Sequence, residues 1–228
     1  MCGRFTLRTP MNRLVERFLF EPQDVVLRPR FNIAPTQPVA VVRQDGSDRQ
    51  RTLAMLRWGL IPSWAKDAAV GNRLINARGE TVSEKPSFRS AFKQRRCLIL
   101  ADGYYEWQKP RDGGAKRPHF FHLVDDAPFA MAGLWERWQS PEGPVVETCT
   151  IITTGANELA GTIHDRMPVI LRPEAHVTWL TVREQDPRVL STLLMPYPAE
   201  FMAVFPVGTT VNNPRNETPE CLLPPGVP

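Results

Sequence analysis

Short apolar runs and alternating apolar and polar positions dominate the chain, and they predict more strand than helix. Strands are predicted over residues 39–43, 52–58, 97–101, 104–109, 119–124, 129–138, 148–154 and 201–206, after an extended stretch at 2–7. A turn at Asp45-Gly46-Ser47 should join the first two of them. Helices are predicted over 10–20, 86–94, 156–163 and 174–180, the first with Thr9 as its N-cap and Pro10 in its first turn.

The order of these elements indicates the fold class. Strands mostly follow one another, and helices interrupt them at irregular intervals, whereas a doubly wound parallel sheet needs regular alternation of the two. No internal repeat, low-complexity segment or linker divides the 228 residues, which suffice to fill one core. We therefore expect an α+β protein with one domain over residues 1–228, in which helices flank a largely antiparallel, barrel-like central sheet.

Composition narrows the class of protein. Hydrophobic residues make up 42% and charged residues 23%, as in ordinary globular proteins. No apolar run approaches the roughly 20 residues that span a bilayer, and Met1–Pro10 lacks the apolar segment of a secretory signal. We expect a cytoplasmic monomer with no membrane contact.

The four cysteines stand at positions 2, 97, 149 and 221, without a CxxC pair. This spacing matches neither a zinc motif nor a small disulfide framework, so we expect no metal and no cofactor. Cys97 and Cys149 lie inside apolar runs and are predicted to be small core residues, and Cys221 is predicted to be structural as well.

The net charge of +4 conceals an asymmetry along the chain. Residues 1–118 hold 22 Lys+Arg against 11 Asp+Glu, whereas residues 119–228 hold 6 against 13. Arginine, which suits bidentate phosphate contacts, accounts for 23 of the 28 basic residues. Two explanations fit this bias: arginine-rich codon usage with a solvated surface, or a polyanionic partner.

Cys2 has an unusual position. A small second residue permits removal of Met1, which would leave an α-amine beside the thiol, with reference pKa values of about 7.7–8.0 and 8.5. Such an aminothiol condenses with an aldehyde to an imine, and the sulfur then closes a thiazolidine ring. Gly3 would let a ligand approach the backbone closely. The alternative is a chance cysteine in a disordered terminus.

Four further motifs offer chemistry, each with an ordinary alternative. Asn76 provides a donor and an acceptor in fixed geometry, or is a turn residue. Glu106 lies between aromatic residues, where a carboxyl can serve as a general acid/base, or is an exposed residue of an edge strand. His164 precedes Asp165 in a loop and suits proton transfer, or belongs to a salt-bridged turn. Trp64, after a proline turn, could stack on bases or be core.

Taken in order, the motifs resemble the SOS-response-associated peptidase family, the abasic-site processing proteins. The matching segments are MCGRF (1–5), RFNIAP (30–35), WGLIPSW (58–64), LINARGET (74–81), ADGYYEW (101–107), IITTGAN (151–157), IHDRMPVIL (163–171) and residues 211–220. The resemblance therefore covers nearly the whole chain.

The resemblance implies a covalent link between Cys2 and the opened sugar of an abasic site in single-stranded DNA, through a Schiff base and then a thiazolidine. It implies that Asn76 orients the linkage, that Glu106 acts as acid/base and that His164 assists proton transfer and reversal. Weak lyase and autoproteolytic activities are also implied.

The resemblance further implies a basic DNA channel and a protein that is nucleoid-associated when bound. The implied DNA-binding residues are Gly3, Arg4, Asn32, Pro35, Arg78, Thr153 and Arg166, together with Trp64 at single-strand/double-strand junctions. The insertion-like stretch Ala65–Arg73 makes the match loose there, so we assign no second junction residue.

Two other functions compete with this interpretation. Glutamine amidotransferases also begin Met-Cys-Gly and use the cysteine as an N-terminal nucleophile, but this chain continues with Arg4-Phe5 and lacks a recognisable synthetase domain. A non-covalent reader of modified DNA would need no chemistry at Cys2.

Overall fold

The computed structural model describes residues 2–22, 25–44, 50–110, 113–141, 143–181 and 186–226. Met1 and the predicted turn Asp45-Gly46-Ser47 lie outside the described residues. Within those ranges, no helix is long and apolar enough to cross a membrane.

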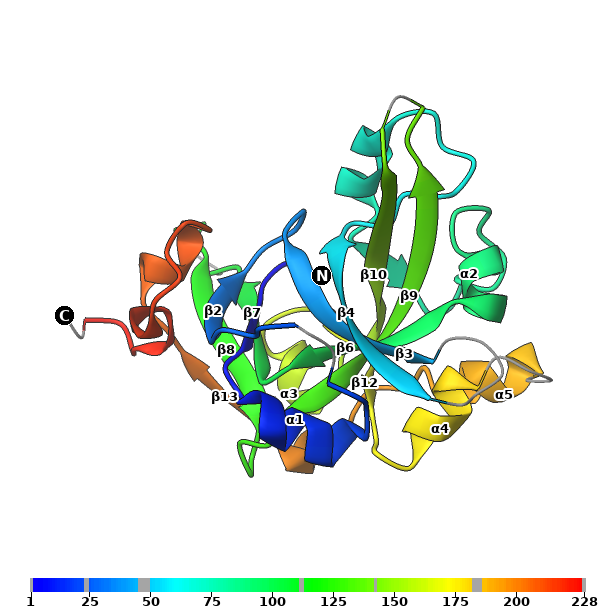
Figure 1. Cartoon of the computed structure of the whole chain (residues 1–228). Helices are drawn as coiled ribbons and strands as arrows, with labels where there is room; N and C mark the ends of the chain where they lie inside the picture. The colour runs from blue at the N-terminus through cyan, green and yellow to red at the C-terminus, as the bar shows by residue number, and fades with distance from the viewer. Residues whose placement is uncertain are drawn as a thin grey trace.

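Five strands close into a barrel. They are β3 (Pro38–Gln44), β4 (Arg51–Trp58), β6 (Arg96–Ala101), β9 (Phe129–Gln139) and β10 (Val145–Gly155). The order is β10-β4-β3-β6-β9, and β9 pairs back with β10. Only the β4–β10 pairing among these five contacts is parallel. Closure leaves no open edge, and the long β9 and β10 extend together beyond the barrel (Figure 1).

A second, five-stranded sheet lies beside the barrel and contains the N-terminal strand. Its strands, in the order β13-β8-β7-β1-β2, are β13 (Met202–Pro206), β8 (Arg117–Leu123), β7 (Gly103–Gln108), β1 (Phe5–Leu7) and β2 (Arg30–Ile33). Because β1 pairs with β7 on one side and β2 on the other, the segment that carries Cys2 enters the interior of the molecule.

Short strands extend the barrel on both sides of its long ribbon. Strand β5 (Asn76–Arg78) runs parallel to β10, and β11 (Arg166–Pro168) pairs with the end of β10. Strand β12 (Ile170–Leu171) pairs with β9. Segments distant in sequence, one with Asn76 and one after His164, are thereby attached to a single strand.

Helices surround the sheets. They are α1 (Met11–Phe18), α2 (Arg89–Gln94), α3 (Glu158–Gly161), α4 (Ala175–Leu180) and α5 (Pro187–Thr192), with 3-10 turns η1 (Ala68–Arg73), η2 (Ala199–Phe201), η3 (Thr209–Asn212) and η4 (Pro219–Leu222). Figure 1 shows α1, α4 and α5 along one side, and the C-terminal 3-10 turns beside β2.

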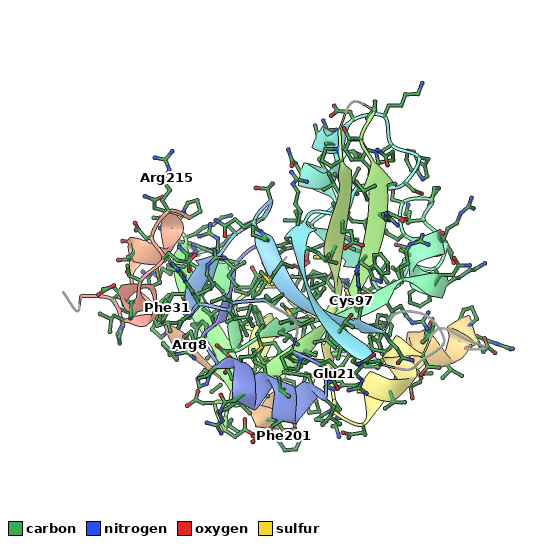
Figure 2. All side chains as sticks on the ribbon, in the orientation of Figure 1. Arg8, Glu21, Phe31, Cys97, Phe201 and Arg215 are labelled. Carbon is green, nitrogen blue, oxygen red and sulfur yellow. The ribbon has the colours of Figure 1, made fainter. Side chains whose placement is uncertain are left out.

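One large core unites the two sheets. Phe5 of β1 packs edge-on against Trp58 of β4, with ring centroids 5.2 Å apart. Cys97 and Cys149 are fully buried, which confirms the prediction of core residues. Figure 2 shows Cys97 among the barrel strands, whereas Arg215 points away from the molecule. Cys221 is buried in a smaller cluster with Tyr105.

The predicted fold class is confirmed: the protein is α+β, with a barrel whose strand pairs are mostly antiparallel. The predicted cap of the first helix is wrong. The helix begins at Met11 with Pro10 at the N-cap position. Thr9 instead donates through its hydroxyl to Asp102 Oδ1 at 2.6 Å, and the Thr9 and Arg8 amides donate to Asp102 Oδ2. A buried carboxylate needs such donors, and Asp102 is 3% exposed.

Candidate functional site

Cys2 is fully buried and held in place, although it is the second residue of the chain. The Tyr105 amide donates to the Arg4 carbonyl at 2.9 Å, which continues the pairing of β7 with the chain on the N-terminal side of β1. The Asn76 Nδ2 group donates to the Cys2 carbonyl at 2.8 Å. The N-terminal segment is therefore attached to both sheets, and the alternative of a disordered terminus does not apply.

Asn76 sits on a rigid support. Strand β5 pairs it with Ile151 of β10, and the Trp58 indole donates to the Ile75 carbonyl at 2.8 Å. While Nδ2 bonds to Cys2, the buried Oδ1 atom has no hydrogen-bond partner among the described residues. The amide thus holds the Cys2 backbone and keeps a buried acceptor atom, so Asn76 is not an ordinary turn residue.

Glu106 is buried and interacts electrostatically with the Cys2 thiol. It is 4% exposed on β7, which rules out an exposed edge residue. Burial raises the pKa of the Cys2 thiol well above its ordinary value, and the negative charge of Glu106 raises it further. The thiol is therefore protonated at neutral pH, and a base must remove its proton before sulfur can act as a nucleophile.

His164 lines a groove next to β7. The groove has a volume of about 800 Å³ and is lined by Trp107, Gln108, Lys109, Pro110, Arg117, Thr162, Ile163, His164 and Asp165. The Gln108 side chain donates to the Thr162 carbonyl at 3.1 Å, which joins the His164 loop to β7 immediately after Glu106. The groove therefore lies against the end of β7 and carries the exposed basic side chains of Lys109 and Arg117.

The two contacts of His164 Nδ1 specify different protonation states. This nitrogen lies 3.0 Å from the Arg166 amide, which can only donate, and 2.9 Å from Asp165 Oδ1, which can only accept. The backbone contact is the more restrained of the two, since Asp165 is 87% exposed. In the neutral ring Nδ1 then accepts and Nε2 carries the proton, whereas protonation would favour the ion pair.

Arg4 and Asn32 join the N-terminal strand to the 211–216 segment. Arg4 Nη1 donates to Asn32 Oδ1 and to the Val211 carbonyl, each at 2.7 Å. Asn32 is fully buried, and its Nδ2 group donates to the carbonyls of Val211, Asn213 and Asn216. Both side chains are engaged within the protein, so their DNA contacts stay predictions, and Asn32 would act through Arg4.

The other predicted DNA-binding residues differ in accessibility. Arg166 pairs with Glu80 at 3.0 Å and donates to the carbonyl of the fully buried Thr153 at 2.7 Å. The Arg166 hydrogen bond is the largest cause of the lowered pKa of Glu80. Arg78 is exposed, Gly3 and Pro35 are half-buried, and Trp64 is 63% exposed. Exposure of Trp64 removes the alternative of a core tryptophan.

Comparison with known proteins places this arrangement in a family. The family model of SOS response associated peptidases (SRAP) matches residues 1–214. The chain belongs to the SRAP family. It is 47% identical over 225 residues to the abasic site processing protein YoqW of Bacillus subtilis, covering 97% of this chain and 99% of YoqW. It is 37% identical to the abasic site processing protein HMCES of Gallus gallus, over 86% of this chain and 66% of HMCES.

Solved structures share the SRAP fold of this chain. A crystal structure of a protein from Bacteroides thetaiotaomicron superposes with a TM-score of 0.87 at 27% identity, covering 98% of this chain and 99% of that one. A crystal structure of a protein from Bordetella bronchiseptica gives a TM-score of 0.76 at 28% identity, over 90% and 99%.

Sequence reasoning missed two carboxylates that organise the site of this SRAP protein. Asp102 holds the turn after β1, and Glu217 accepts hydrogen bonds from the amides of Phe31 and Asn32 at 2.6 and 2.8 Å. Both lie in motifs that carried the resemblance. Their neighbours in sequence gave no sign of these contacts, since the partners are at least 93 residues away.

Proposed function

We propose that this protein, after loss of Met1, links Cys2 covalently to abasic sites in single-stranded DNA through a Schiff base and then a thiazolidine. One observation carries the proposal: the buried Cys2 is fixed by Asn76, and the buried Glu106 interacts electrostatically with its thiol. Membership of the SRAP family supports it, since relatives of similar length are named abasic site processing proteins.

The order of bond formation follows from the two nucleophiles of Cys2. The α-amine has a reference pKa of about 7.7–8.0 and is partly neutral near pH 7.5, whereas burial and Glu106 keep the thiol protonated. The amine therefore attacks the aldehyde carbon first. A carbinolamine forms, its hydroxyl leaves as water after accepting a proton, and the imine remains.

Sulfur then completes the product. Glu106 takes the proton of the thiol, the sulfur bonds to the imine carbon, and the imine nitrogen gains a proton, so the thiazolidine contains all atoms of imine and thiol. Glu106 would take the proton that the attacking amine releases, give it to the leaving hydroxyl and then accept the proton of the thiol. Asn76 holds the Cys2 backbone in position throughout.

His164 serves proton transfer on the groove side of the linkage. With Nδ1 accepting from the Arg166 amide, the neutral ring carries its proton on Nε2, which would donate to the sugar oxygens. The same transfer run backwards opens the thiazolidine, so His164 also assists reversal. An imine intermediate permits β-elimination, which accounts for a weak lyase activity. The peptidase in the family name would correspond to cleavage that exposes the Cys2 amine.

The DNA strand would follow the groove beside His164. Lys109 and Arg117 line that groove and suit phosphate contacts, and the exposed Arg78 lies on β5 two residues after Asn76. Trp64, 63% exposed, can stack on bases at a single-strand/double-strand junction. Arg166 would have to exchange its pairing with Glu80 for a phosphate.

An adduct that survives SDS tests the proposal. The purified protein is incubated with an abasic single-stranded oligonucleotide, and the wild type should form a slowly migrating band that Cys2→Ala lacks and Cys221→Ala retains. A band of equal intensity in Cys2→Ala would overturn the proposal. Release of ammonia from glutamine that requires Cys2 would instead support an amidohydrolase, and binding without any adduct would support a DNA reader.

A further inference from the structure

Tyr104 carries a buried hydroxyl that the fold does not use. The residue is 0% exposed, and its ring stacks on Phe121 with centroids 4.8 Å apart and an interplanar angle of 5°. Its hydroxyl has no hydrogen-bond partner among the described residues. A buried hydroxyl without a partner lowers stability, and a phenylalanine would make the same stacking contact without that cost. The hydroxyl therefore requires an explanation outside packing.

The position of Tyr104 on β7 offers an explanation for its buried hydroxyl. Tyr104 and Glu106 are alternate residues of β7 and so share one face of the strand. Tyr104 pairs directly with Phe5 of β1, three residues after Cys2. Cys2 and Tyr104 belong to the same buried core cluster. Burial raises the pKa of the Tyr104 hydroxyl well above its ordinary value, and the negative charge of Glu106 contributes to the increase. The phenol stays protonated and can donate a hydrogen bond.

We propose that Tyr104 is a catalytic residue of the reaction at Cys2: its hydroxyl donates a hydrogen bond to the aldehyde oxygen while the amine attacks. This inference rests on the proposed function. As the C–N bond forms, the electron pair of the C=O bond moves to oxygen, and a donor fixed in a dry site stabilises that charge. The two protons that the amine nitrogen gives up pass through Glu106 to this oxygen, which leaves as water.

Tyr105 offers a matched control on the adjacent residue. It is also fully buried, but its side chain points to the other face of β7 and packs in the smaller cluster with Phe120. Its hydroxyl donates to the Phe31 carbonyl at 2.8 Å. Loss of this hydroxyl leaves a carbonyl without its donor, so Tyr105→Phe should lower the thermal stability and leave the chemistry intact.

The experiment compares wild type, Tyr104→Phe and Tyr105→Phe on two aldehydes. One is an abasic single-stranded oligonucleotide, and the other is free 2-deoxyribose, which carries the same hydroxyaldehyde without DNA. The imine is trapped with cyanoborohydride and quantified by intact mass, and the melting temperature is measured for each variant. We expect Tyr104→Phe to form the imine more slowly, on the order of 100-fold as for loss of one such donor, with an unchanged or raised melting temperature.

Four outcomes are decisive. Slow trapping by Tyr104→Phe alone, with no loss of stability, supports the role of the hydroxyl. Equal rates for wild type and Tyr104→Phe overturn it, while the wild-type adduct still supports the proposed function. Reaction of the wild type with 2-deoxyribose but not with abasic DNA refutes the proposed substrate, and the Tyr104 comparison is then decided on the sugar. If the wild type traps neither aldehyde, both proposals fall.

Discussion

His176 makes stability depend on pH in a way that the structure quantifies. The side chain is 3% exposed, it contacts the Phe18 ring, and its Nε2 atom has no hydrogen-bond partner among the described residues. Burial, and to a smaller extent the positive charges of Arg51 and Arg17, lowers its pKa from 6.5 to about 4. The folded protein therefore keeps the ring neutral at pH values where the unfolded chain protonates it.

The sign and size of the His176 effect on the free energy of unfolding follow from proton linkage. Since the unfolded state binds the extra proton, stability falls as the pH drops from 6.5 towards 4, and no further contribution is lost below the folded pKa. The shift corresponds to about 3.4 kcal/mol in full. Between pH 7.5 and pH 5.0 the loss from His176 should be about 2 kcal/mol, because at pH 5.0 the unfolded histidine is almost fully protonated and the folded one is not.

Urea unfolding at pH 7.5, 6.5, 5.5 and 5.0 measures this loss through tryptophan fluorescence. Carboxylates also titrate in this range, so the quantity to compare is the difference between wild type and His176→Phe, in which they contribute equally. The variant keeps an aromatic ring against Phe18 and loses the titrating group. We expect the wild type to lose about 2 kcal/mol more than the variant. Parallel pH profiles of the two proteins would show that His176 does not cause this loss of stability.

Further predictions concern the site and its support. Glu106→Gln should slow adduct formation and leave DNA binding intact; equal single-turnover rates would remove Glu106 from the mechanism. His164→Ala should change the rates of imine formation or reversal, which trapping and exchange with a second oligonucleotide measure, and unchanged rates would count against its role. Adduct yield at limiting DNA should fall as salt rises, since phosphate contacts release counterions; salt-independent yield would argue against a basic groove. Gly103→Ala should lower stability by about 1–3 kcal/mol in urea, because its Cβ would lie 2.2 Å from Phe120 Cζ; wild-type stability would show that β7 and β8 can separate.

Much of the fold follows from the local pattern, because strands buried on both faces carry continuous runs of apolar residues. The runs at 97–101 and 129–138 correspond closely to β6 and β9. Strands of two or three residues, such as β5 and β12, carry too few positions to show a period. They form because β10 and β9 offer partners, and that pairing, like the closure of the barrel, depends on residues far apart in sequence.

The candidate site, like the fold, can be predicted from the sequence only in part. The motifs indicated Cys2, Asn76 and Glu106, and the fold brings these residues together from β5, β7 and the segment before β1. The burial of Cys2 could not be predicted, since it results from the insertion of β1 between β2 and β7. The pairing of Arg166 with Glu80 and the internal hydrogen bonds of Asn32 likewise join segments more than 80 residues apart.

The central claim is a covalent bond from Cys2 to the sugar of an abasic site. Intact mass spectrometry after incubation with abasic single-stranded DNA tests it most directly. We expect a protein without Met1 whose mass increases by that of the oligonucleotide minus one water, with peptide mapping that places the linkage on Cys2. A protein that stays unmodified, or one linked through another residue, would refute the proposed function.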